Sequence, residues 1–301
     1  MPDIQPADTP LQVSENEPSK AEIKRAIRQL KNGKAAVPDG IPSEAIKADL
    51  NTLTKMLYEL FGKIWEMNEI PDDWKEGCLI KLPKKGDLKE CKNWRGIMLL
   101  SMAGKVLNRI ILERLKVEVD EWLREEQAGF RKDRSCADQI ATLRIILEQS
   151  LEWNSPVYAT FVDYEKAFDS VDREVLWKLL CHYGFPEKYI TLIQKTYEKC
   201  TCRVIHNGVL SELFEMLTGV RHGCLLSPFL FLLVIDWIMR RTTDKHQDGI
   251  QWTLAARLED LDFADDIALL SHNHRSMQSE LTRLAKISMQ TGLTISNPRR
   301  R

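Results

Sequence analysis

Residues 263–266 read Phe-Ala-Asp-Asp, and the apolar run Ile-Ala-Leu-Leu follows at 267–270. The apolar run predicts a buried strand, so Asp265 and Asp266 lie at a strand edge, where an uncompensated charge is costly. Two carboxylates about 4 Å apart repel each other by roughly 4 kcal/mol at an effective dielectric constant of about 20. The pair is therefore either a solvated turn or part of a site in which a divalent cation removes the repulsion.

A second carboxylate ends another predicted strand. Residues 157–163 read Val-Tyr-Ala-Thr-Phe-Val-Asp, and alternate residues share a face, so Asp163 ends an otherwise apolar row. If Asp163 lies beside Asp265, carboxylate oxygens would hold two cations, the arrangement that activates an attacking hydroxyl and stabilises a leaving phosphate oxygen. Consecutive strand residues point to opposite faces, which favours Asp265 over Asp266 as the nearer ligand.

These two segments resemble a known family. Phe-Ala-Asp-Asp resembles the Tyr/Phe-Ala-Asp-Asp box of reverse transcriptases, and residues 161–171 resemble their first catalytic box as it occurs in non-LTR (LINE-type) retrotransposons. Further segments are similar to that family in the same order: 33–34 with 38–42, 82–87, 93–97, 126–131 and 218–228. Several boxes in order make this resemblance specific.

The resemblance implies an α+β fold, the fingers-palm module of a right-hand polymerase, in which an antiparallel palm sheet packs on helices. It divides the chain into a flexible lead at 1–18, a fingers region at 19–156 and a palm region at 157–301. We expect the thumb to be absent, because the palm region is truncated at its C-terminal end.

Composition is compatible with this fold. The 301 residues are 44% hydrophobic and 29% charged, as expected of a globular chain. The seven cysteines are scattered, so reduced thiols and an intracellular protein, in the cytoplasm or nucleus, are expected. The longest apolar run, 229–235, is far shorter than the roughly 20 residues of a membrane span, and the N-terminus lacks a signal peptide pattern. We therefore expect no membrane partner.

Positive charge is concentrated in one stretch. The net charge is −1, yet residues 81–116 contain ten Lys/Arg and three acidic residues. Such a stretch is typical of phosphate binding. The part at 105–116 is also explained as the solvated face of a helix that buries an apolar stripe, whereas the loop at 82–95 is not.

Local signals predict further elements. In the first part of the chain they are a helix that begins with a capping box at Ser19 and ends at Gly33, a helix at 51–67, and strands at 77–82 and 95–100. Asp172 caps the first of two helices that continue to about 198. A hairpin of 201–205 with 209–217 follows around Asn207-Gly208, and Ser227-Pro228 begins a helix at 229–239.

The resemblance assigns roles residue by residue. Asp163, Asp265 and Asp266 would be the catalytic ligands of two Mg²⁺ ions, with Mn²⁺ as a substitute. Phe168 would form an aromatic wall under the sugar that excludes a 2′-hydroxyl, with core packing as the alternative. Arg95 would lie over the triphosphate, since a planar donor fork suits phosphate oxygens.

Five further positions are substrate-binding candidates through the same resemblance. Lys81, Lys84 and Lys85 would contact phosphates, although loop lysines are usually solvated. His222 and Gly223 belong to the box near the template and the nascent base pair, where His222 replaces the usual glutamine and so changes the hydrogen-bonding groups.

Two other departures accompany His222. Val37 stands where the family has glycine, and a β-branched residue does not easily adopt positive φ. The tail at 292–301 begins like the family's next box but ends in Pro-Arg-Arg-Arg, where a lysine-containing motif is expected.

The leading hypothesis is an RNA-directed DNA polymerase of a retrotransposon, a nucleotidyltransferase that adds dNTPs to a DNA primer 3′ end on an RNA template. One alternative is a decayed or repurposed fragment that binds nucleic acid without chemistry, which His222, Val37 and the missing thumb favour. A two-metal nuclease is a third, but it requires neither Phe168 nor the basic loop.

Overall fold

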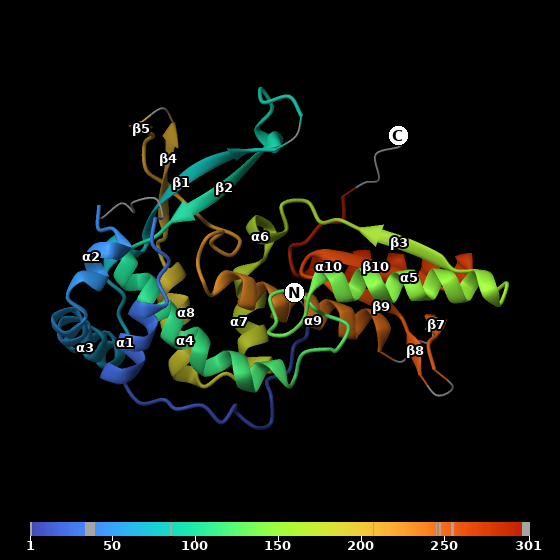
Figure 1. Cartoon of the computed structure of the whole chain (residues 1–301), viewed down its shortest axis with the longest axis horizontal. Helices are drawn as coiled ribbons and strands as arrows, with labels where there is room; N and C mark the ends of the chain where they lie inside the picture. The colour runs from blue at the N-terminus through green and yellow to red at the C-terminus, as the bar shows by residue number, and fades with distance from the viewer. Residues whose placement is uncertain are drawn as a thin grey trace. The chain divides into compact units, whose positions relative to one another are not determined.

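The computed structural model describes residues 2–33, 40–84, 86–206, 208–244, 246, 248–253 and 256–296 (Figure 1). Several sequence predictions lie outside the described residues. They concern Lys34, Val37, Pro38 and Asp39 of the first loop, Lys85 of the basic loop, Asn207 of the hairpin, and the tail at 297–301.

Contacts divide the chain into two compact units. One unit comprises 1–5, 120–179 and 228–301, and the other comprises 6–119 and 180–227. The ranges predicted from sequence were contiguous, whereas each unit combines distant stretches, because the chain leaves a unit and later returns to it. The fingers and palm names for the predicted ranges remain predictions.

The unit that contains 6–119 is rich in helices. Its helices are α1 (Lys20–Arg28), α2 (Ser43–Ala48), α3 (Leu50–Met67), α4 (Met102–Asp120) and α8 (Glu187–Tyr197), with 3₁₀ turns η1 (Asp72–Trp74) and η2 (Cys91–Asn93). The capping box is confirmed, because the Ser19 hydroxyl accepts from the Glu22 amide and the Glu22 carboxylate accepts from the Ser19 amide. The helix ends at Arg28 and not at Gly33, which does adopt a positive φ of 66°.

The sheet of this unit confirms the strands around the basic loop. β1 (Glu76–Pro83) pairs antiparallel with β2 (Trp94–Leu99) and parallel with β4 (Thr201–His206). The hairpin arm predicted at 209–217 is broken into β5 (Val209–Leu210) and β6 (Phe214–Glu215), which both pair with β4. The basic loop therefore joins two paired strands.

The other unit contains a three-stranded antiparallel sheet in the order β3-β10-β9. Its strands are β3 (Tyr158–Val162), β9 (Asp260–Phe263) and β10 (Asp266–Ser271), and a separate ribbon pairs β7 (Ile250–Gln251) with β8 (Arg257–Leu258). The expectation of an apolar row ending in Asp163 is wrong with respect to burial, since Phe161 is 71% exposed. β3 is an edge strand, and its buried residue is Val162.

Helices complete this unit as α5 (Cys136–Glu152), α6 (Ala167–Ser170), α7 (Arg173–His182), α9 (Ser227–Thr243) and α10 (His274–Gln290). Asp172 caps α7 as predicted, because its carboxylate accepts from the amides of Glu174 and Val175. Mixed helices and strands confirm the α+β class. Among the described residues, no helix has the length and apolarity needed to cross a membrane.

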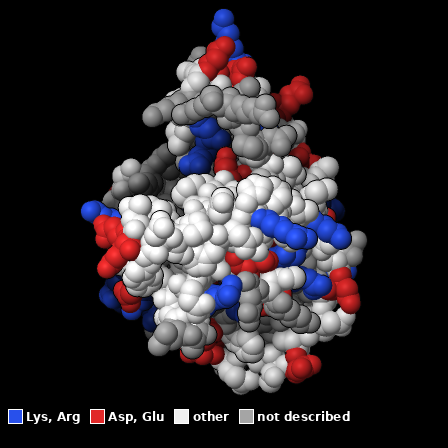
Figure 2. Space-filling view, turned by 90° about the vertical axis from the view of Figure 1, so that its right-hand side faces the viewer, with Lys and Arg blue, Asp and Glu red and all other residues white. Residues whose placement is uncertain are grey.

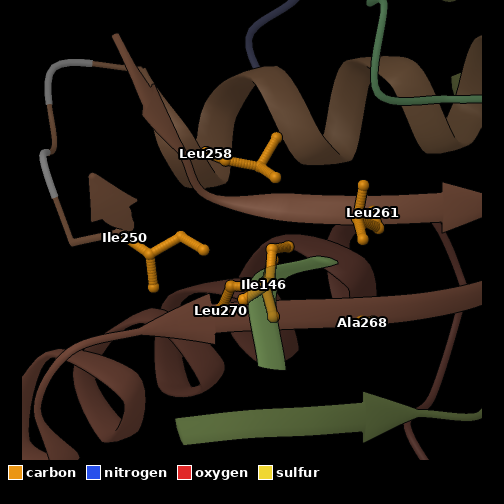
Figure 3. Packing of buried hydrophobic residues seen from close by; sticks show 6 residues of the cluster. All are labelled: Ile146, Ile250, Leu258, Leu261, Ala268 and Leu270. Carbon is orange, nitrogen blue, oxygen red and sulfur yellow. The ribbon is translucent and has the colours of Figure 1, made fainter. Parts of the chain in front are cut away.

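Helix α5 covers one end of the face of the sheet that carries Asp163. Ile146 of α5 packs with Leu261 of β9 and with Ala268 and Leu270 of β10 (Figure 3). The aspartates follow at the other end of this face, where Asp163 and Asp266 are exposed. Packing thus anchors the strands and leaves the acidic end accessible.

Candidate active site

The Phe-Ala-Asp-Asp segment forms a tight turn between β9 and β10. Phe263 pairs with Asp266, so Ala264 and Asp265 are the two turn residues. Ala264 has a φ of 58°, a left-handed conformation that costs a residue with a Cβ roughly 1–2 kcal/mol. The turn places Asp265 at its tip and Asp266 at the start of β10.

Asp163 lies directly beyond β3, which pairs with β10. The last pair of this ladder is Val162 with Ile267. Continuing the antiparallel register by one residue puts Asp266 opposite Asp163, and opposite residues carry their side chains on the same face. The structure thus does not support the sequence-based preference for Asp265 as the nearer residue.

The charges of Asp265 and Asp163 act on the carboxyl group of Asp266. Burial raises the pKa of Asp266, and the charges of Asp265 and Asp163 raise it further. Carboxylate oxygens are the ligands that Mg²⁺ prefers, and a cation would relieve this repulsion. No set of three His, Cys, Asp or Glu side chains within the described ranges is arranged closely enough to hold a metal ion. Carboxylate oxygens match the ligand chemistry of a divalent cation, but the described side chains are not arranged as a coordination site.

The segment at 294–296, which follows α10, also contacts Asp163. The Ser296 amide donates to the Asp163 carbonyl oxygen at 2.7 Å, and its hydroxyl donates to the Asp163 carboxylate at 3.4 Å. The Glu165 amide donates to the Thr294 carbonyl oxygen at 2.9 Å. The sequence resembles the start of a family box here but predicts no role for Ser296.

Two buried carboxylates of β9, the strand that leads into the turn, share one arginine. Arg124 lies 2.5 Å from the Asp260 carboxylate and 3.2 Å from that of Asp262, and both carboxylates are fully buried. Burial raises the pKa of both carboxyl groups, and Arg124 opposes this shift. Sequence reasoning missed this cluster, because nothing local marks Arg124 as buried.

Phe168 belongs to an aromatic cluster. Its ring stacks on that of Phe231 with centroids 4.5 Å apart, and the ring of Phe130 meets it edge-on at 6.5 Å. Phe231 is fully buried, whereas Phe168 is half-buried. The ring is thus fixed by packing on one face and partly accessible, so the sugar-wall role stays a prediction.

The predicted phosphate-binding residues lie on the β1-β2 hairpin. Lys81 pairs with Gly96, and its ammonium lies 5.0 Å from the centroid of the Trp94 ring. Arg95 and Lys84 are exposed, and the Lys84 amide donates to the Asn93 carbonyl oxygen, which closes the loop. Charged groups are therefore available on this hairpin.

His222 and Gly223 lie against the same hairpin. The His222 carbonyl oxygen accepts from the Met98 amide at 2.7 Å. Gly223 has a φ of 112°, and a Cβ there would overlap the Met98 carbonyl oxygen, so the position requires glycine. The preceding Arg221 is only 2% exposed and lies over the Tyr197 ring, which sequence reasoning did not predict.

The candidate residues fall into two groups. Asp163, Asp265, Asp266 and Phe168 belong to one unit, and Lys81, Lys84, Arg95, His222 and Gly223 belong to the other. The pairing of β3 with β10 makes Asp163 a neighbour of the Asp265-Asp266 turn, and the hydrogen bond from Met98 joins His222 to the β1-β2 hairpin.

Comparison with known proteins identifies the family of the chain. The family described as "Reverse transcriptase (RNA-dependent DNA polymerase)" matches residues 82–298, which is more than half of the chain. The chain belongs to the reverse transcriptase family. Its resemblance to the enzymes of non-LTR retrotransposons is also confirmed by the relatives it matches.

Three relatives illustrate the similarity. The "Transposon TX1 uncharacterized 149 kDa protein" of Xenopus laevis is 30% identical over 71% of this chain and 16% of that protein. The Pol polyprotein of the Drosophila melanogaster element R2DM is 28% identical over 86% of the chain and 24% of its own length. The "RNA-directed DNA polymerase from mobile element jockey" is 24% identical over 83% of the chain and 27% of its length. The chain thus spans about a quarter or less of these relatives.

Proposed function

We propose that this chain is an RNA-directed DNA polymerase of a retrotransposon, which adds dNTPs to a primer 3′ end on an RNA template. The observation that best supports the proposal is that Asp163, Asp265 and Asp266 lie at the ends of paired strands, where burial and the other two charges raise the pKa of Asp266. Perturbed carboxyl groups of this kind mark candidate catalytic sites.

Asp163, Asp265 and Asp266 would hold two Mg²⁺ ions, or Mn²⁺ in their place. Such ions, when bound, activate an attacking hydroxyl and neutralise charge on a leaving phosphate oxygen. The chain itself orients the carboxylates, since the β9-β10 turn fixes Asp265 and Asp266 while Ser296 contacts Asp163. Phe168 would exclude a ribose 2′-hydroxyl from the bound nucleotide.

Nucleic acid and dNTPs would be bound through concentrated positive charge. On the face drawn in Figure 2, Lys and Arg are interspersed with Asp and Glu among wide uncharged areas, as the net charge of −1 suggests. Phosphate contacts are proposed for Lys81, Lys84, Lys85 and Arg95 because residues 81–116 contain ten Lys/Arg and only three acidic residues. His222 and Gly223 would face the template and the nascent base pair.

Replacing Lys84 and Lys85 with alanine should flatten the slope of log affinity against log salt by up to about two units. The reason is that binding releases fewer counterions when fewer phosphates are neutralised. The slope is measured by titrating RNA-DNA duplex at several salt concentrations. The control, Lys55→Ala with Lys63→Ala on α3, removes the same charge from exposed helix positions. Equal slopes for both double variants would show that the loop lysines are merely solvated.

Phe168→Val should raise incorporation of ribonucleotides relative to deoxynucleotides, because a smaller side chain leaves room for the 2′-hydroxyl. The ratio of kcat/KM for the two nucleotides measures this effect. Phe231→Leu, which disturbs the buried side of the same stack, should lower thermal stability with a much smaller change in the ratio. An unchanged ratio in folded Phe168→Val would assign Phe168 to the core alone.

Primer extension with Mg²⁺, dNTPs and an RNA template tests the proposal. Extension that depends on the template and on Mg²⁺ is the expected result. Binding of the duplex without extension would favour the repurposed fragment, and cleavage of the duplex would favour the nuclease.

A further inference from the structure

A buried amide side chain contacts the turn that carries the aspartates. Gln127 is 1% exposed. Its Oε1 accepts from the Ala264 amide at 2.8 Å and from the Gly129 amide at 2.7 Å, and its Nε2 donates to the Ala264 carbonyl oxygen at 3.2 Å. One side chain thus satisfies both backbone polar groups of the residue that precedes Asp265.

Ala264 needs such support because of its backbone conformation. Its φ of 58° is unfavourable for a residue with a Cβ, and alanine has no polar side chain that could stabilise the conformation locally. Strained residues of this kind persist only where the surrounding structure over-determines them. The contacts from Gln127 are therefore a physical reason why the turn keeps this shape.

The segment at 126–129 is held close to the turn by its backbone. The Ala128 amide donates to the Asp262 carbonyl oxygen at 2.9 Å, and the Asp262 amide donates to the Glu126 carbonyl oxygen at 3.2 Å. A Cβ on Gly129 would overlap the amide nitrogen of Ala264, so the approach depends on glycine there. The segment extends the sheet beside β9 and delivers Gln127 to the turn.

Arg131 fixes the backbone of this segment through hydrogen bonds. Its guanidinium donates to the carbonyl oxygens of Gln127 at 3.1 Å and of Arg124 at 2.6 Å, and to the Asp120 carboxylate at 2.7 Å. The Arg131 side chain is only 5% exposed. Gln127 is therefore attached to an anchored loop and not to a mobile one.

We infer that Gln127 is a positioning residue, which holds the Ala264 turn in its left-handed conformation and so orients Asp265 and Asp266 toward Asp163. Its effect on catalysis rests on the proposed function. Its effect on the turn does not rest on that function, since the hydrogen bonds between Gln127 and Ala264 are present whether or not the turn takes part in catalysis.

The test compares Gln127→Ala with Gln139→Ala. Gln139 donates to the carbonyl oxygens of Glu126 and Asp262, on the same two segments, but does not contact the turn. We expect Gln127→Ala to lower kcat for primer extension by about 100-fold, as a displacement near 1 Å can, with KM for dNTP changed far less. Gln139→Ala should lower kcat by less than about threefold at a similar thermal midpoint. Equal kcat losses in the two variants would overturn the inference.

Amide hydrogen exchange decides the same question without activity. In Gln127→Ala, exchange at the Ala264 amide should be at least about tenfold faster than in Gln139→Ala, because its acceptor is gone. Gln127→Met, which keeps the side-chain length, replaces Gln127→Ala if the latter does not fold. Unchanged exchange at Ala264 would overturn the inference. If the wild-type chain extends no primer, the proposed function fails, while exchange at Ala264 still tests the role of Gln127.

Discussion

Primer extension on an RNA template is expected to fall by about 10³-fold or more when Asp163 or Asp265 is replaced by asparagine. Asparagine keeps the size of the side chain but removes the charge that would hold a divalent cation. We expect a comparable loss for Asp266→Asn, because the register puts Asp266 opposite Asp163. Affinity for the RNA-DNA duplex should change little, since its phosphates are contacted by Lys and Arg.

Single-turnover extension and duplex titration, performed on the same preparations, measure these effects. Asp133→Asn is the matched control, because the Asp133 side chain is 84% exposed and its positive φ suits asparagine. This variant should extend primers like the wild type. Wild-type extension rates in a folded Asp163→Asn protein would disprove the assignment of the catalytic carboxylates.

Arg124→Met is expected to cause the largest loss of stability, about 3–5 kcal/mol in the free energy of unfolding. The substitution leaves Asp260 and Asp262, both fully buried, without the guanidinium that they share. For a chain of this size the melting temperature should fall by about 10 °C. Thermal and denaturant unfolding measure the change.

Arg144→Met serves as its control. Arg144 pairs with Glu148 within α5, and the two side chains are 80% and 64% exposed. Such a surface pair contributes only about 0.3–0.5 kcal/mol, so stability should hardly change. Replacing Asp260 and Asp262 with asparagine in the Arg124→Met background should restore part of the loss. Equal stabilities of Arg124→Met and Arg144→Met would contradict the role of the buried cluster.

Local signals in the sequence were sufficient for much of the fold. The capping box at Ser19, the cap at Asp172 and the two strands around the basic loop appear as predicted, because each depends on residues close together in the chain. For the candidate site, the sequence indicated the strand ends that carry the carboxylates, while the roles of these residues remain predictions. Asp163 follows β3 and Asp266 begins β10, and the structure pairs these two strands as neighbours.

The remaining features depended on tertiary contacts. The burial of Arg124, Gln127 and Arg221 could not be predicted, because a polar side chain is stable inside a protein only through partners that lie far away in sequence. The exposure of Phe161 followed from the edge position of β3, which periodicity does not reveal.

The amino-acid sequence by itself determined which carboxylates lie beside strand ends, because strand periodicity is a local property. Only the tertiary structure decided that β3 pairs with β10 in a register that points Asp266 toward the position opposite Asp163, that Ser296 contacts Asp163, and that distant stretches share one unit. The register of the strands, and the way in which distant stretches combine into one unit, are set by the packing of residues over a hundred positions apart. No local sequence pattern encodes this packing.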